Sequence, residues 1–237
     1  MAKLFVIIPA AGKGERMGPN SNKLFMEVCG IPVITHTLLA FENYKKTGVD
    51  VNAVVVTNES NIEPINDVIS SNGITCVKKI TLGGASRTLS VYNGLKALKE
   101  LDEVPESDDI VFIHDGARCL TTNEVFENCR TLMETHDVCV SGTQVKNTIK
   151  RVEDGIIVET LERSSLVEVQ TPQSFKYDVL KRSYENAISN NIEATDDTAL
   201  AEILGYKVAI APGSYENIKI TTKEDILIAE GLLNKRG

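Results

Sequence analysis

Residues 4–18 read LFVIIPAAGKGERMG, a short apolar run that leads directly into a glycine-rich loop. The run at 5–9 is typical of a strand that is buried on both faces of a parallel sheet. In an open α/β sheet, the loop after such a strand lies at the carboxyl end of the sheet, where ligands bind. The stretch therefore predicts an α/β fold with a ligand site at the end of its first strand.

Outward from this stretch, short β-branched runs alternate with segments of helical period, which is the pattern of βαβ units. Further buried strands are predicted at 53–57, 75–80, 110–114 and 138–142. Helices are predicted at 33–42, 62–72, 86–100, 123–136, 177–190 and 222–235. The last helix has a start signal, Thr222-x-x-Asp225. We therefore expect an α/β, Rossmann-like, mostly parallel sheet with helices on both faces.

Residues 144–168 break the alternation, because apolar and polar residues alternate there around an Asp154-Gly155 turn signal. A hairpin inserted in this way has too little apolar surface to be stable alone. We therefore expect it to be an extended arm that packs on another subunit in a homodimer. A hairpin folded back over its own domain is the alternative. With this arm inserted, residues 1–237 are expected to form a single domain.

Composition limits the partners of the chain. It has 237 residues, of which 42% are hydrophobic, and its net charge is −8, from 25 basic and 33 acidic residues. No global basic field would draw it to nucleic acid or anionic lipid, so an anionic ligand requires a local basic cluster. The N-terminal apolar run is too short for a signal-peptide core or a membrane span, which indicates a cytoplasmic protein. The five cysteines lack metal-ligand spacing and are expected to be reduced, mostly buried thiols.

The loop after the first strand has the chemistry of a phosphate site. Gly12 and Gly14 allow backbone amides to approach phosphate oxygens. The loop is not a P-loop, because G-x-x-x-x-G-K-[ST] is absent, and it is not a complete dinucleotide fingerprint, because Met17 stands where the third glycine should be. Arg16 and Lys23 can converge on a triphosphate and neutralise charge that builds on its α-phosphate. This interpretation is nucleotidyl transfer, and a tight turn without a ligand is the alternative.

Eight collinear stretches extend this interpretation over nearly the whole chain. They are IIPAAGKGERMG…NKLF, GGASRTLSVYNGL (83–95), IHDGAR (113–118), NTIK (147–150), ER (162–163), QTPQSF (170–175), TDDTALAE (195–202) and ENIKIT (216–221). Together they resemble the 2-C-methyl-D-erythritol 4-phosphate cytidylyltransferase family of the non-mevalonate isoprenoid pathway, within the sugar-nucleotidyltransferase superfamily. The resemblance implies an enzyme that transfers CMP from CTP to methylerythritol phosphate and releases pyrophosphate.

The resemblance also implies catalytic roles. Arg16 and Lys23 would stabilise the pentacoordinate α-phosphate, and Lys219 would bind the substrate phosphate near the attacking oxygen. The nucleophile is already an anion, so the reaction needs no general base. Mg²⁺ would bridge the CTP phosphates, with Asp115 nearby.

Two sets of binding residues follow from the same resemblance. The CTP set is Ala10, Ala11, Gly12, Gly14, Gly84, Ala85, Ser90, Asp115 and Gly116. The methylerythritol phosphate set is Asp115, Arg118, Thr148, Arg163, Thr171 and Lys219. In this scheme the segment 84–90 would hold cytosine. Thr148 and Arg163 would reach from the arm into the neighbouring subunit's site.

Two positions depart from the pattern of the family. Cys119 stands where proline is usual, which puts the rigidity of the following loop in question. Asn147 stands where aspartate is usual, which removes one charge from the arm and can loosen its local bonding.

Three alternatives remain at this point. A cytidylyltransferase for a pentitol phosphate, such as ribitol 5-phosphate, would share the CTP site and differ in the alcohol pocket. A non-catalytic nucleotide-binding protein is disfavoured by the presence of Arg16, Lys23, Asp115 and Lys219 together. A nicotinamide oxidoreductase is disfavoured because no acidic residue ends the second strand.

Overall fold

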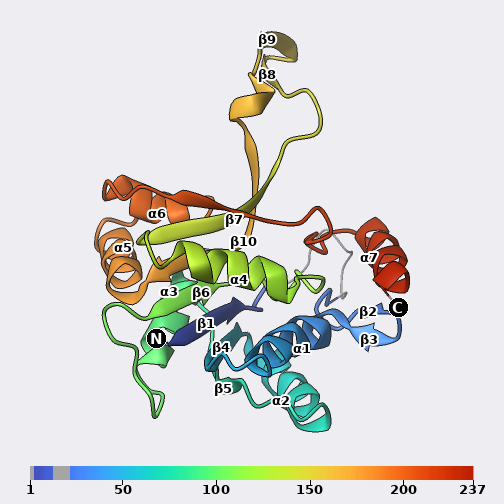
Figure 1. Cartoon of the computed structure of the whole chain (residues 1–237), viewed down its shortest axis with the longest axis vertical. Coiled ribbons are helices and arrows are strands. Elements are labelled where there is room, and N and C mark those ends of the chain that lie inside the picture. The colour runs from blue at the N-terminus through green and yellow to red at the C-terminus, as the bar shows by residue number, and fades with distance from the viewer. Residues whose placement is uncertain (1–2, 13–21, 237) are drawn as a thin grey trace.

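The computed structural model describes residues 3–12 and 22–236, which build one central seven-stranded sheet. The strand order is β11-β7-β10-β6-β1-β4-β5 (Figure 1). The strands are β1 Leu4–Pro9, β4 Val51–Thr57, β5 Val77–Leu82, β6 Ile110–Ile113, β7 Val138–Gln144, β10 Val167–Lys176 and β11 Ala209–Pro212. Of these strands, β10 is antiparallel to both of its neighbours, and the other pairings are parallel. The predicted mostly parallel sheet is confirmed.

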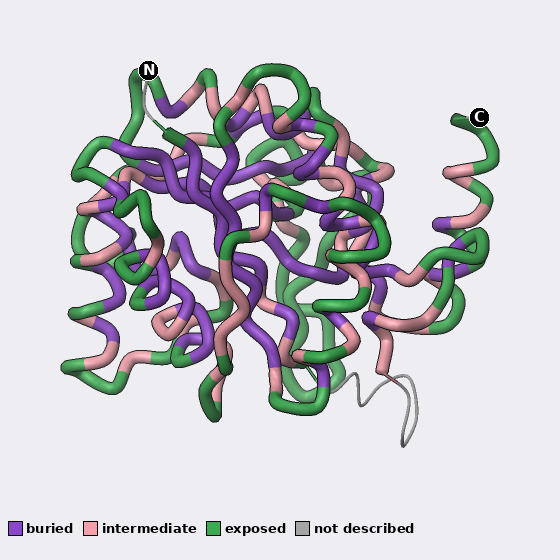
Figure 2. Tube along the Cα trace, turned by 90° about the horizontal axis from the view of Figure 1, so that it is seen from below, coloured by how far each residue is buried: buried purple, intermediate pink, exposed green. Residues whose placement is uncertain are grey.

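Helices cover both faces of this sheet, as predicted. They are α1 Val33–Lys45, α2 Ile62–Ser71, α3 Arg87–Leu98, α4 Asn123–Leu132, α5 Tyr177–Ser189, α6 Thr198–Ile203 and α7 Lys223–Arg236. Side chains of β1 alternate between the two faces, so that Val6 packs with α1 and α4 while Ile7 packs with α3 and α5. Buried residues are concentrated along the central strands (Figure 2). Among the helices of the described ranges, none has both the length and the apolar character needed to cross a bilayer.

The differences from the predicted elements have local causes. All five predicted strands are present, although β5 begins and ends two residues later than expected. The strand β10 was not predicted because its buried segment carries Gln170, Pro172 and Gln173 in place of an apolar alternation. The short elements that were also missed are α6, β11, the two-stranded pair β2 Glu27–Val28 and β3 Ile31–Pro32, and the 3₁₀ turns Glu59–Asn61 and Arg163–Ser165.

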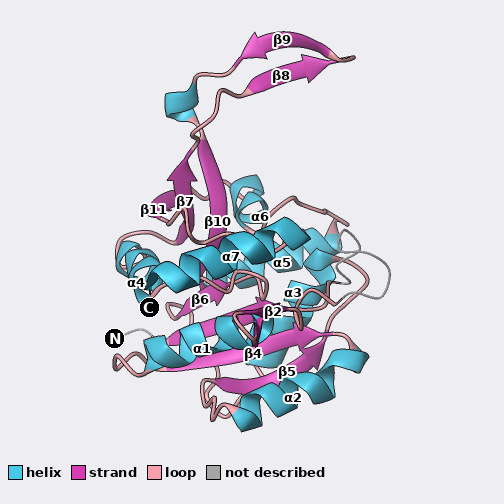
Figure 3. Ribbon diagram, turned by 90° about the vertical axis from the view of Figure 1, so that its right-hand side faces the viewer, coloured by secondary structure: helices cyan, strands magenta, loops and turns pink. Residues whose placement is uncertain are grey.

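The predicted arm is present. Its strands β8 (Lys150–Glu153) and β9 (Ile156–Thr160) pair with each other in a separate two-stranded sheet. Asp154 and Gly155 connect them with φ values of 48° and 79°, the left-handed conformation that an Asp-Gly hairpin turn requires. Every residue of both strands is exposed, and the arm projects away from the body (Figure 3). The alternative of a hairpin folded back over its own domain is therefore wrong.

The cysteines are free, as expected, and four of the five are buried. Cys119, which replaces the usual proline, is 4% exposed and belongs to the core on the face of the sheet that α1 and α4 cover. Burial raises the pKa of its thiol to about 11, so the thiol stays protonated near neutral pH.

Candidate active site

A pocket of about 640 Å³ opens at the carboxyl ends of β1 and β6, beside the start of α3. Four backbone segments form its wall: the loop after β1, the loop that enters α3, the turn after β6, and the segment between β11 and α7. Its lining residues are Pro9, Ala10, Ala11, Gly12, Lys23, Leu24, Gly84, Ala85, Ser86, Arg87, Ser90, Asp115, Gly116, Ala117, Lys219 and Thr221. The pocket therefore lies at the end of the first strand, where the sequence placed a ligand site.

Most of the predicted site residues meet in this pocket. Eight of the nine residues predicted to bind CTP line it: Ala10, Ala11, Gly12, Gly84, Ala85, Ser90, Asp115 and Gly116. Lys23 and Lys219, which were predicted to be catalytic, line it as well. Gly14 and Arg16 lie outside the described residues. The binding and catalytic roles of all these residues remain predictions.

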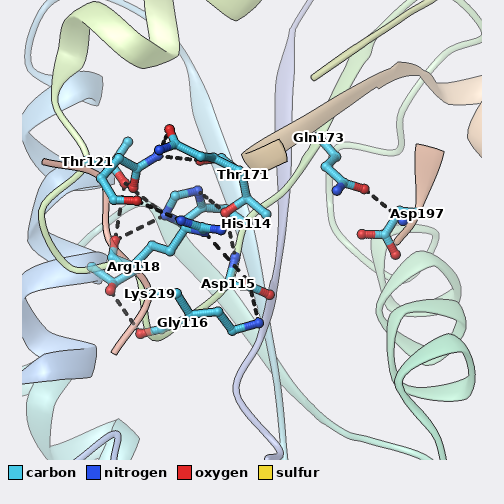
Figure 4. A network of polar contacts seen from close by, with 12 residues as sticks. His114, Asp115, Gly116, Arg118, Thr121, Thr171, Gln173, Asp197 and Lys219 are labelled. Atoms are coloured by element: carbon cyan, nitrogen blue, oxygen red, sulfur yellow. Dashed lines mark hydrogen bonds and ion pairs between the residues drawn. The ribbon is translucent and has the colours of Figure 1, made fainter. Parts of the chain in front are cut away.

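Asp115 lies at the electrostatic centre of the pocket. Its Oδ2 is 2.7 Å from Nζ of Lys219 and 3.8 Å from Nε of Arg118 (Figure 4). Its Oδ1 is 3.8 Å from Nη2 of Arg87. Burial alone would raise the pKa of the carboxyl, but the charges of Lys219 and Arg87 outweigh it and hold that pKa near 2. Asp115 is therefore an anion near neutral pH.

A buried polar network holds the backbone of Asp115 from behind. Its N–H donates to Thr171 Oγ1 over 3.1 Å, and that oxygen is 3.0 Å from Nδ1 of His114. His114 Nε2 faces the carbonyl oxygen of Arg118, which can only accept, so Nε2 carries the proton and Nδ1 accepts from Thr171. Burial lowers the pKa of His114 to about 4, in agreement with a neutral ring.

The same network fixes the chain on the other side of the pocket. Asn217 Nδ2 donates to the carbonyl oxygen of Thr171 over 2.8 Å, and Thr121 donates to Asn217 Oδ1 over 2.7 Å. Arg118 Nη1 donates to the carbonyl oxygen of Asn217 over 2.6 Å. Because Asn217 precedes Lys219 by two residues, these bonds place Lys219 opposite Asp115 (Figure 4).

Arg118 and Thr171 are thus used in internal contacts in this structure. Thr171 is 3% exposed and is not among the lining residues, and the guanidinium of Arg118 is bonded to backbone. Both were predicted to bind the substrate, and that prediction remains untested. In this structure Thr171 accepts a hydrogen bond from the N–H of Asp115, and Arg118 lies next to the carboxylate of Asp115.

Local hydrogen bonds hold the loop that enters α3. The N–H of Gly84 donates to Ser90 Oγ over 3.0 Å, and that hydroxyl donates to the carbonyl oxygen of Ser86 over 2.8 Å. Ser86 also caps the helix by accepting from the N–H of Leu89, as the sequence indicated. A Cβ at Gly84 would lie 2.4 Å from Cβ of Leu89, so the close approach requires glycine.

The two predicted arm residues lie away from the pocket of their own chain. Thr148 is exposed, and Arg163 Nη1 donates to the carbonyl oxygen of Lys146 over 2.9 Å at the base of the arm. Neither is among the lining residues of the pocket. The predicted action of Thr148 and Arg163 on a neighbouring subunit stays a prediction.

Sequence reasoning missed several residues that shape the site. Arg87 lines the pocket, and His114, Thr121 and Asn217 support it from the core. Arg87, His114 and Asn217 lie within the motifs quoted above, and Thr121 lies three residues after IHDGAR. Their roles were missed because a motif does not show which of its side chains faces another motif in space.

The described residues contain no cluster of three or more carboxylate, histidine or cysteine side chains that could hold a metal ion. Among the described residues that line the pocket, Asp115 is the one carboxylate. This donor set fits a hard divalent cation that is bound mainly through the oxygens of a ligand, in the way Mg²⁺ binds nucleotide phosphates.

Comparison with known proteins decides the family. The model of the 2-C-methyl-D-erythritol 4-phosphate cytidylyltransferase family matches residues 4–235. The chain belongs to this family. A family member from Halalkalibacterium halodurans, a 2-C-methyl-D-erythritol 4-phosphate cytidylyltransferase, is 42% identical over 232 residues, which cover 98% of this chain and 97% of that protein.

Solved structures of the family have the same fold as this cytidylyltransferase. The 4-diphosphocytidyl-2C-methyl-D-erythritol synthase of Anaerococcus prevotii aligns with a TM-score of 0.83 at 30% identity, over 98% of this chain and 99% of that one. The cytidylyltransferase of Thermus thermophilus aligns with a TM-score of 0.78 at 26% identity, over 98% and 99% of the two chains. The predicted α/β fold and the predicted enzyme class are therefore confirmed.

Proposed function

We propose that this cytidylyltransferase transfers CMP from CTP to 2-C-methyl-D-erythritol 4-phosphate in the non-mevalonate isoprenoid pathway. The products are 4-diphosphocytidyl-2-C-methyl-D-erythritol and pyrophosphate. The observation that carries the proposal is the meeting of Lys23, Asp115 and Lys219 with the segment 84–90 in one pocket. The names of the relatives favour methylerythritol phosphate over a pentitol phosphate as the acceptor.

CTP would lie across the pocket from the start of α3 to the loop after β1. The exposed backbone of Gly84 and Ala85, together with the hydroxyl of Ser90, would read the cytosine edge. The ribose would face Asp115 and the amide of Gly116, beside the end of β6. The triphosphate would then follow the segment 10–12 towards Lys23, where amides and positive charge favour phosphate.

The reaction is a substitution at the α-phosphorus. An oxygen of the 4-phosphate forms the new bond as the bond to the β-phosphate oxygen breaks, and pyrophosphate leaves. Lys23 and Arg16 would stabilise the charge on the pentacoordinate α-phosphate, and Lys219 would orient the attacking phosphate. No residue has to remove a proton, so Asp115 acts as an anion that aligns ligands and Lys219.

A divalent cation, Mg²⁺, would be held by the CTP phosphates with Asp115 nearby. When bound, the cation would neutralise negative charge on the phosphates. Asp115 is the single carboxylate among the lining residues that the structure describes, which supports this arrangement, because a metal cage made by the protein alone would need more ligands.

The chain would act as a homodimer of single domains joined by the 144–168 arm. Three of its apolar side chains, Val152, Ile156 and Ile157, are 54%, 68% and 60% exposed, which is unusual for residues of this type. A two-fold partner could cover them and bring Thr148 and Arg163 over its own pocket. A cytoplasmic location is part of the proposal, and the apolar run at 4–9 is compatible with it because the run forms β1 in the core.

One experiment tests the proposed function. The purified protein is incubated with CTP, Mg²⁺ and either methylerythritol 4-phosphate or ribitol 5-phosphate, and pyrophosphate release is followed. We expect the methylerythritol substrate to react far faster. Equal or reversed rates would overturn the assignment of the acceptor.

A further inference from the structure

The motif TDDTALAE (195–202) has no part in the function proposed so far, yet it contains a carboxylate that is almost fully buried. Asp197 is 1% exposed, and both of its oxygens are bonded by side-chain donors. Arg87 donates to both oxygens, and the hydroxyl of Tyr184 donates to Oδ1. The N–H of Asp197 in turn donates to Gln173 Oε1 on β10 over 2.7 Å (Figure 4). The carboxylate is thereby fixed against rotation.

Arg87 connects this buried carboxylate with the pocket. It is the first residue of α3 and lines the pocket wall. Its Nη1 and Nη2 lie 2.5 and 2.6 Å from the two oxygens of Asp197, which is the bidentate geometry of a guanidinium with a carboxylate. The same Nη2 lies 3.8 Å from Oδ1 of Asp115. Arg87 therefore lies between one carboxylate that holds it and a second that faces the ligand.

The charges explain why both partners are needed. Desolvation would lower the pKa of Arg87, but the adjacent Asp197 outweighs it and raises that pKa, so the guanidinium is always charged. The Arg87–Asp197 pair as a whole is neutral, and the Nη2 side of its guanidinium faces Asp115. When Lys219 turns to a substrate phosphate, Asp115 still has Arg87 as a cationic neighbour. A lysine at position 87 could supply the charge but not the two-pronged contact.

The backbone of Arg87 also belongs to the loop that lines the proposed base end of the pocket. The preceding residues Gly84 and Ala85 are exposed there, and Ser90 lies one turn further into α3. The side chain of Arg87 ties this segment to α6 and β10, which belong to the core. Without that tie, the loop would depend on the bonds of its own serines.

We propose that Asp197 and Arg87 form a positioning pair, in which Asp197 holds Arg87 so that the loop 84–90 and Asp115 keep the geometry that CTP requires. In this proposal the pair contacts neither the attacking phosphate oxygen nor the α-phosphorus. It acts through the loop and through Asp115. The inference rests on the proposed function, and it assigns a role to the otherwise unused motif at 195–202.

The test compares Arg87→Gln, Asp197→Asn and the double variant. Each single variant is expected to weaken CTP binding about tenfold by calorimetry and to lower kcat by about 10², on the scale of removing a residue that orients catalytic groups. The KM for methylerythritol phosphate is expected to change less than the KM for CTP. Because the two residues act as a unit, the double variant should be no worse than the poorer single variant.

A matched control is the exposed pair on α5, in which Arg182 Nη2 lies 2.8 Å from Asp178 Oδ2. Arg182→Gln removes an arginine from a similar ion pair outside the site and is expected to leave CTP affinity and kcat unchanged. Arg87→Lys keeps the charge and covers the case in which Arg87→Gln does not fold. It should lower kcat about tenfold, because the two-pronged contact is lost.

A third readout needs no ligand. Charged Lys219, Arg118 and Arg87 face Asp115, together with neutral His114 and Thr171. In a carbon-13 NMR titration, loss of Arg87 should move the midpoint of the Asp115 carboxyl upward. Three results would each overturn the proposed role of the pair. The first is CTP affinity and kcat within twofold of wild type in folded Arg87→Gln or Arg87→Lys. The others are additive effects in the double variant and an unmoved midpoint of the Asp115 carboxyl. If the wild type does not transfer CMP, the proposed function fails, and the titration still decides whether Arg87 acts on Asp115.

Discussion

The carboxylate of Asp115 and the ammonium of Lys219 face each other across the pocket at 2.7 Å. The first residue follows β6, and the second lies in the segment between β11 and α7. The contact keeps Asp115 ionised and holds Lys219 with its charge directed into the pocket. An anion and a cation are thus already in place before a phosphate arrives, which is the preorganisation that charge stabilisation requires.

Lys219→Ala is expected to lower kcat by about 10² or more, because one positioned positive charge would be missing beside the attacking phosphate. Steady-state pyrophosphate release measures the effect. Lys223→Ala removes an exposed lysine four residues later and should keep wild-type kcat. A Lys219→Ala enzyme that changes only the KM for its phosphate substrate would assign Lys219 to substrate binding alone.

The arm predicts an active site that is shared between subunits. An Arg163→Ala protein and a Lys23→Ala protein should each be nearly inactive, because each lacks one charge at every site. After subunit exchange, a mixed dimer should contain one site with both wild-type residues, and activity should return. Exchange is verified independently with a fluorescent label on each protein. If exchange occurs and the mixture stays as inactive as its parents, the arm acts on its own subunit.

The buried ring of His114 predicts a dependence of stability on pH. Its pKa is about 4 in the folded protein against 6.5 for the free side chain, so the unfolded chain binds more protons between these values. The free energy of unfolding should therefore be unaffected by this group above pH 6.5. Between pH 6.5 and 4 it should fall by about 1.4 kcal/mol for each pH unit.

Urea unfolding of His114→Gln at several pH values measures this contribution. The variant should be less stable than wild type at pH 7 because the bonds to Thr171 and Arg118 change, and its stability should depend less on pH between 6.5 and 4. His136→Gln, at an exposed position, should keep the dependence of the wild type. An identical slope in His114→Gln would show that this ring does not cause it.

Gly84→Ala is expected to weaken CTP binding about tenfold or more. The added methyl group would lie 2.4 Å from Cβ of Leu89, so the loop would have to move. The N–H at position 84 would then lose its hydrogen bond to Ser90 Oγ. Calorimetric titration with CTP measures the change. Gly231→Ala is the control, because a Cβ there meets nothing within 4 Å. Wild-type affinity in Gly84→Ala would show that the loop tolerates the shift.

Much of the fold was accessible from local sequence. The strands at 5–9 and 53–57 were found because central parallel strands are apolar on both faces, and this pattern is visible without any partner. The turn at Asp154-Gly155 was found for an equally local reason, since few residues accept the positive φ that the turn imposes. The eight collinear motifs indicated the family, and the family match confirmed it.

The strand β10 and the electrostatics of the site depended on tertiary structure. A strand that buries Gln170 and Gln173 is stable only because distant groups, at Ser214, Asn217 and Asp197, satisfy their amides. Likewise, the ionisation of Asp115 depends on charges from two other segments of the chain, at Arg87 and Lys219. Such contacts join residues that are far apart in the sequence, and their strength depends on distance and burial, which only the folded chain sets.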